Sequence, residues 1–126
     1  MLPQKLNALG TEIVDCAYTV HRNIGPGLLE RVYETCFVRE LELRDIHVET
    51  QIPIAFQYKG LQIEDAYRLN IIIERQIIVE LKAVEKLLPV HSAQLLSYMK
   101  LAKCPLGYHI NFNVPLIKEG IHRIAL

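Results

Sequence analysis

The run Ile77-Ile78-Val79-Glu80-Leu81-Lys82 is a short apolar segment that carries one acid and one base. Its branched aliphatic residues predict a β-strand, in which side chains alternate between the two faces of the sheet. Glu80 and Lys82 therefore share one face, and Val79 and Leu81 share the other. Charged groups lose hydration in such apolar surroundings, which favours a functional site. The alternative is an exposed cross-strand ion pair on a half-solvated sheet.

The segment before this run is equally strand-like and has Asn70 in its middle. A three-residue turn centred on Arg75 would join the two strands as an antiparallel hairpin and place Asn70 directly opposite Glu80, with Cβ atoms about 4.5–5.5 Å apart. A two-residue turn would instead place these two side chains on opposite faces, because a one-residue slip inverts the alternation. The odd-length turn gathers the polar groups on one face, and we favour it for that reason.

The favoured register has two further consequences. It places Arg68 opposite Lys82, on the same face as Asn70 and Glu80. The other face then keeps a continuous apolar surface for the core, formed by Leu69, Ile71, Val79 and Leu81.

The rest of the chain predicts helices and strands that are joined by short connections. Apolar residues at helical spacing predict helices over 5–22, 28–44 and 90–103, and strands are expected over 47–58, 61–74, 77–82, 106–113 and 121–126. This order predicts an α+β fold, in which a mixed central sheet contains an antiparallel β-meander and is flanked by helices. We expect one domain over residues 1–126.

The composition narrows the class of protein. The chain has 14 basic and 14 acidic residues, so its formal charge of zero argues against broad electrostatic capture of a polyanion. No apolar run approaches the roughly 18–20 residues that span a bilayer, and the N-terminus lacks a signal-peptide core. We expect a soluble, cytoplasmic protein without a membrane partner. Its cysteines are widely spaced, which favours reduced, buried thiols over disulfides or metal ligands: Cys16, Cys36 and Cys104.

Short motifs lie on most of the predicted elements. They are Gly27-Leu28-Leu29-Glu30-Arg31-Val32-Tyr33, Tyr67-Arg68-Leu69-Asn70, Val79-Glu80-Leu81-Lys82-Ala83-Val84-Glu85, Gln94-Leu95-Leu96-Ser97-Tyr98 and Ile110-Asn111-Phe112-Asn113. Together they resemble the GxxExxY proteins, which are assigned to the PD-(D/E)XK, or restriction-endonuclease-like, nuclease superfamily. The resemblance covers residues 6–126 and implies a restriction-endonuclease-like core.

The resemblance also implies a site for Mg²⁺ or Mn²⁺ and hydrolysis of phosphodiester bonds in DNA or RNA. Clustered oxygen ligands suit such hard cations, and Lys82 would orient the attacking water. On position alone, Glu30 could instead stabilise the helix dipole. The implied catalytic residues are Glu30, Glu80, Lys82 and Gln94, and the implied metal ligands are Glu30, Asn70, Glu80 and the backbone carbonyl of Leu81.

Asn70 departs from the pattern of the family, which carries Asp at this place in the strand. An amide oxygen can bind a hard cation but brings no charge, so the site is expected to bind metal more weakly. Three hypotheses follow: an Mg²⁺-dependent nuclease that is impaired by Asn70, an inactive nuclease-fold domain that binds nucleic acid or a protein partner, and a homodimeric structural protein.

Overall fold

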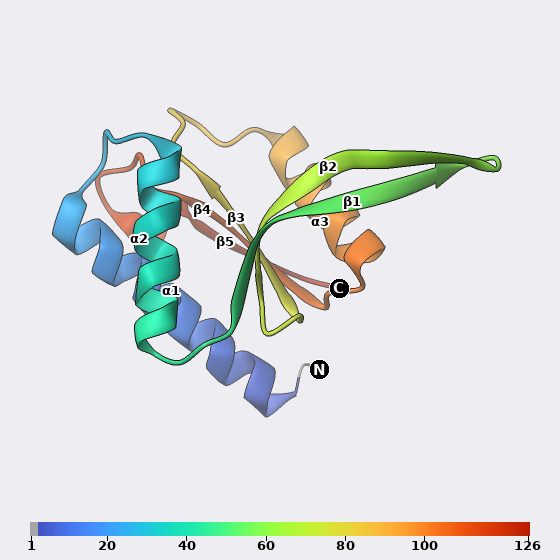
Figure 1. The fold of residues 1–126 in the computed structure, drawn as a ribbon. Helices are drawn as coiled ribbons and strands as arrows, with labels where there is room; N and C mark the ends of the chain where they lie inside the picture. Colours follow the sequence, from blue (N-terminus) through green and yellow to red (C-terminus); the bar gives the residue numbers. More distant parts are fainter. Residues whose placement is uncertain (1–2) are drawn as a thin grey trace.

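A computed structural model describes residues 3–126 and shows an α+β fold (Figure 1). The helices and strands lie close to the predicted ranges, with a short 3₁₀ helix added before the last strand. They are α1 (Gln4–Ile24), α2 (Glu30–Leu43), β1 (Val48–Tyr58), β2 (Leu61–Ile73), β3 (Ile77–Lys82), α3 (Pro89–Ala102), β4 (Leu106–Asn111), η1 (Ile117–Gly120) and β5 (Ile121–Ala125). None of the helices in this part of the chain has the length and apolar character needed to cross a membrane.

The five strands form one mixed sheet in the order β1-β2-β3-β4-β5. β1, β2 and β3 form the predicted antiparallel meander, whereas β3 and β4 are parallel and are connected through α3. One face of the sheet packs against α1 and α2, in a core that includes Ile13, Phe37 and Val79. The opposite face packs against α3 through Leu95 and Met99. The arrangement is consistent with a restriction-endonuclease-like core.

The predicted register of the β2–β3 hairpin is confirmed. Ile71 pairs with Val79, and Ile73 pairs with Ile77, so the intervening turn has three residues with Arg75 at its centre. All four paired residues are fully buried in the core beneath α1 and α2. The apolar run of β3 is therefore buried because helices cover both faces of its sheet.

β2 pairs with β3 only through Ile71–Ile73, although it pairs with β1 along most of its length. The rest of β1 and β2 projects from the sheet as a two-stranded arm, formed by residues 52–69 and drawn in green in Figure 1. Gln51, which lies between the pairs formed by Thr50 and Ile52, has a left-handed backbone with φ of 51°. β1 bends at Gln51, and the neighbouring strand β2 separates from β3 at Asn70. We call this region, around Gln51 and Asn70, the fork.

The bend overturns two predictions that assumed a straight strand. Leu69 is fully buried, but it lies in the core next to α3 rather than on the α2 face. Arg68 does not lie opposite Lys82, because it belongs to the arm, where it pairs with Pro53 and forms an ion pair with Asp65. Side-chain alternation therefore changes at the fork.

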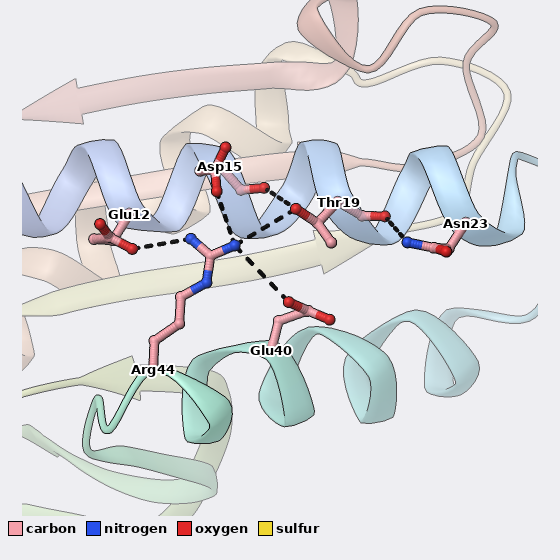
Figure 2. A network of polar contacts seen from close by, with 6 residues as sticks. All are labelled: Glu12, Asp15, Thr19, Asn23, Glu40 and Arg44. Carbon is pink, nitrogen blue, oxygen red and sulfur yellow. Dashed lines mark hydrogen bonds and ion pairs between the residues drawn. The ribbon is translucent and has the colours of Figure 1, made fainter.

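Arg44, the C-cap residue directly after α2, ties that helix to α1 (Figure 2). Its guanidinium contacts Glu12 at 2.9 Å, Asp15 at 2.8 Å and Glu40 at 3.8 Å, and it donates a weaker hydrogen bond to Thr19. Three carboxylates share the one guanidinium of Arg44, so this network fixes the position of α2 relative to α1. The position of α2 in turn determines where its acidic residues lie relative to the sheet.

Candidate functional site

Asn70 is the centre of the polar contacts at the fork. Its backbone N–H donates to Oε1 of Glu80 at 3.3 Å, and its side-chain Oδ1 accepts the N–H of Leu81 at 2.8 Å. Its side-chain Nδ2 donates to Oε1 of Glu34 at 2.9 Å. The side chain of Asn70 thus gives the Leu81 N–H a hydrogen-bond acceptor at the place where β2 no longer pairs with β3.

Glu80 is a buried carboxylate, with 7% of its surface exposed. Burial raises its pKa from 4.5 to about 7, against the lowering effects of the Asn70 N–H and of Lys82. The carboxylates of Glu30 and Glu34 raise this pKa further. Near neutral pH Glu80 can therefore gain or lose a proton, which is a property of residues in functional sites.

Lys82 lies at the end of β3, where the chain after it is held by a buried asparagine. Asn111 on β4 pairs with Lys82 in the sheet, and its side chain bonds to both the N–H and the carbonyl of Val84. The carbonyl of Lys82 accepts the N–H of Phe112 at 2.9 Å. These bonds fix the backbone from which the half-buried Lys82 side chain projects.

Glu30 is the first residue of α2 and is exposed. The preceding loop is anchored by Tyr33, whose hydroxyl donates to the carbonyl of Gly25 at 2.6 Å and accepts the N–H of Leu28 at 3.1 Å. The ring of Tyr33 stacks on Phe112 with centroids 4.6 Å apart. The spacing between Glu30 and Tyr33 therefore has a physical reason, since the tyrosine fixes the loop from which the helix begins.

Glu34 is an acid of this site that the sequence reasoning missed. It is half-buried, and its Oε1 accepts hydrogen bonds from Asn70 and from Gln51, each at 2.9 Å. Its position four residues after Glu30 was the available signal, because residues four apart share one face of a helix. A pocket of about 230 Å³ brings these groups together, and its lining residues are Glu30, Arg31, Glu34, Gln51 and Asn70.

A larger cavity of about 660 Å³ lies elsewhere, between α1, the end of α2 and the β2–β3 turn. Its charged lining residues include Glu12 and Arg44, which already bond to one another. The smaller pocket at the fork is the better site candidate, because Asn70 and Gln51 both donate there to the carboxylate of Glu34.

The α3 side of the site contains a pair of stacked tyrosines. The rings of Tyr67 on β2 and Tyr98 on α3 have centroids 4.2 Å apart. Burial raises the pKa of Tyr98, and the nearby carboxylate of Glu80 raises it further. Gln94 shares this helix but is exposed, and no hydrogen bond within residues 3–126 links it to Glu80 or Asn70. Its predicted catalytic role remains a prediction.

The donor types at the fork suit a hard divalent cation, since carboxylate and amide oxygens are the ligands that Mg²⁺ prefers. Asn70 Oδ1 keeps a second lone pair beyond the one that accepts the Leu81 N–H. Across residues 3–126 there is no group of three or more His, Cys, Asp or Glu side chains arranged to hold a metal ion. The donors are thus chemically suitable, but an asparagine takes the place of one carboxylate.

Comparison with known proteins gives one family match. A model of the PD-(D/E)XK nuclease superfamily matches residues 7–124, which is nearly the whole described chain. No curated protein and no solved structure matches. The narrower assignment to the GxxExxY proteins remains a prediction.

Proposed function

This chain belongs to the PD-(D/E)XK nuclease superfamily, and from that premise we propose that it hydrolyses phosphodiester bonds of DNA or RNA with Mg²⁺ or Mn²⁺. The observation that supports this best is the buried Glu80, which lies at the fork next to Asn70 and precedes Lys82 on the same strand. In this proposal, the resemblance to the superfamily assigns this acid and base to its (D/E)XK pair.

In this proposal the oxygens of Glu30, Asn70, Glu80 and the Leu81 carbonyl hold the cation. When bound, a divalent cation lowers the pKa of a bound water and offsets charge on the phosphoryl oxygens. Glu80 must be ionised to serve as a ligand, so cation binding should release its proton and should strengthen as the pH rises. Lys82 contributes a fixed positive charge that stabilises the negative charge developing on the phosphate.

Asn70 should weaken this site, because its amide brings no charge to the cation. We therefore expect cation binding that is weak and cleavage that is slow relative to the same chain with a carboxylate at this position. The change Asn70→Asp tests this directly, since it replaces one side-chain nitrogen by oxygen and adds one negative charge.

Calorimetric titration with Mg²⁺ and Mn²⁺, combined with cleavage assays on single- and double-stranded DNA and RNA, would test the proposal. We expect binding and cleavage that Glu80→Ala abolishes and Asn70→Asp strengthens. Glu42→Gln is the control, because Glu42 is exposed near the far end of α2. A native chain that binds neither ion and shows no cleavage dependent on Glu80 would contradict the proposal.

A second candidate function is a nuclease-fold domain that binds nucleic acid or a protein partner without cleaving it. The observation that favours it is the hydrogen bonding of Asn70. Asn70 bonds to Glu80, Glu34 and Leu81 directly, without a cation between these groups. Binding of DNA or RNA that persists in EDTA and is unchanged in Glu80→Ala would support this candidate over the enzyme.

The homodimer hypothesis has its own supporting observation. The outer part of the arm presents apolar side chains on one face, with exposed fractions between 39% and 62%: Phe56, Tyr58, Leu61 and Ile63. A second copy of the chain could cover this surface. Light scattering at micromolar concentration would decide the question, since a monomeric mass would reject a dimer.

A further inference from the structure

We infer that Glu34 supplies the negative charge that Asn70 lacks, so that cation binding at the fork depends on Glu34 and Asn70 acting as a pair. This inference rests on the proposed metal-dependent function. It assigns a role to a residue outside the motifs that carry the superfamily resemblance.

The position of Glu34 is fixed by two amide donors. Gln51 and Asn70 both donate to its Oε1, each at 2.9 Å. Gln51 reaches it from the left-handed backbone position at the base of the arm. Hydrogen bonds from two neutral donors hold the carboxylate of Glu34 in place.

The same contacts leave oxygen atoms available for a ligand. Within residues 3–126, Glu34 accepts through Oε1 and makes no hydrogen bond through Oε2. Glu80 likewise accepts from Asn70 through Oε1, while its Oε2 makes no hydrogen bond in that part of the chain. Each carboxylate thus uses one oxygen to hold Asn70 and keeps the other for a cation.

The charge at residue 70 explains why the pair acts together. A carboxylate at this position would face that of Glu34 at hydrogen-bond distance, and two such groups cannot both ionise unless a cation or a proton lies between them. The amide of Asn70 removes the repulsion between two carboxylates and donates a hydrogen bond to Glu34 instead. Glu34 and Asn70 therefore form a carboxylate–amide pair that is in hydrogen-bond contact without a cation between them.

An exchange of the two side-chain types tests the inference. Mn²⁺ binding would be measured by calorimetry for the native chain, for Glu34→Gln, for Asn70→Asp and for the double variant Asn70→Asp/Glu34→Gln. We expect Glu34→Gln to weaken binding about 10-fold to 100-fold, as loss of a supporting carboxylate typically does. The double variant moves the charge to residue 70 and should restore most of the native affinity. Glu42→Gln is the matched control on α2.

The outcomes separate this inference from the proposed function. A native chain that binds no Mn²⁺ contradicts the proposed function and the inference together. Native binding that Glu34→Gln leaves unchanged contradicts the inference alone, as does a folded double variant that binds no better than Glu34→Gln. Circular dichroism of each variant establishes folding, and the double variant retains a carboxylate–amide pair if Glu34→Gln itself fails to fold.

Discussion

The backbone N–H of Asn70 donates a hydrogen bond to the carboxylate of Glu80 where β2 separates from β3. Regular pairing between β2 and β3 extends only to Ile71 and Val79, which are the chain neighbours of Asn70 and Glu80. The site residues therefore replace strand–strand hydrogen bonds at this point. Changes at the fork should alter both the stability of the sheet and the chemistry of the site.

Glu80→Gln should stabilise the protein at alkaline pH. Because the pKa of Glu80 rises from 4.5 to about 7 on folding, the folded state holds its proton more tightly than the unfolded state. This contribution is fully present below about pH 4.5 and is lost as the pH rises through about 7. The shift corresponds to roughly 3 kcal/mol. Glutamine keeps the acceptor for the Asn70 N–H without titrating.

Urea unfolding of both proteins at about pH 4.5, 6 and 8 would measure this difference. The gain from Glu80→Gln should be small at the lowest pH and largest at the highest. Equal differences at every pH would show that the Glu80 pKa is not raised in the folded protein.

Tyr67→Phe and Tyr33→Phe should have different effects on stability. The Tyr67 hydroxyl is buried and has no hydrogen-bond partner within residues 3–126, so its removal should leave stability unchanged or raise it by up to about 1 kcal/mol. The Tyr33 hydroxyl bonds to both Gly25 and Leu28, and its removal should cost about 1–3 kcal/mol. Thermal denaturation of both variants checks the contrast, and a larger loss for Tyr67→Phe would contradict it.

Arg44→Gln should destabilise the protein by about 1–2 kcal/mol, because the cation shared by Glu12, Asp15 and Glu40 is lost. The effect should shrink at high salt, which screens both the original attraction and the remaining repulsion. The control is Arg68→Gln, since the ion pair of Arg68 with Asp65 is exposed and should contribute less than about 1 kcal/mol. Similar losses in chemical denaturation would contradict the assignment of Arg44 as the link between α1 and α2.

Gly120→Ala should be among the most damaging small substitutions. A Cβ at Gly120 would overlap the backbone carbonyl of Asn111, which cannot move aside. At Gly107 a Cβ would instead meet the flexible side chains of Met99 and Leu95. We expect Gly120→Ala to cost more than about 4 kcal/mol and Gly107→Ala to cost less. Equilibrium unfolding of the two variants provides the comparison.

Much of the fold follows from local patterns in the sequence. The apolar run of β3 and the odd-length turn after β2 predicted the pairing of Ile71 with Val79, which the structure confirms. The positions of Arg68 and Leu69 were wrong because strand alternation was assumed to continue through Asn70. The alternation changes at Asn70 on β2, because Leu69 and Ile71 lie in different cores. On β1 the change accompanies a left-handed backbone at Gln51, and glutamine is not a residue that marks such a position.

The candidate site was predictable only in part, because its contacts join distant elements. The placement of Asn70 beside Glu80 came from the hairpin register alone. The bond between Asn70 and Glu34 requires α2 to lie against the fork, and no local periodicity predicts how a helix docks on a sheet. The Arg44 network that helps to fix this docking likewise joins residues far apart in the sequence.

The division of β2 between the arm and the sheet has a consequence for the order of folding. Contacts within the arm join neighbours in sequence, such as Gln57 and Gln62, and the entropy lost on closing such a short loop is small. The hydrogen bond between Glu34 and Asn70 at the fork instead joins residues that are 36 positions apart in the sequence, so a much longer loop must close. We therefore expect the arm to form early in folding and the acidic pocket to form late, once α2 has docked.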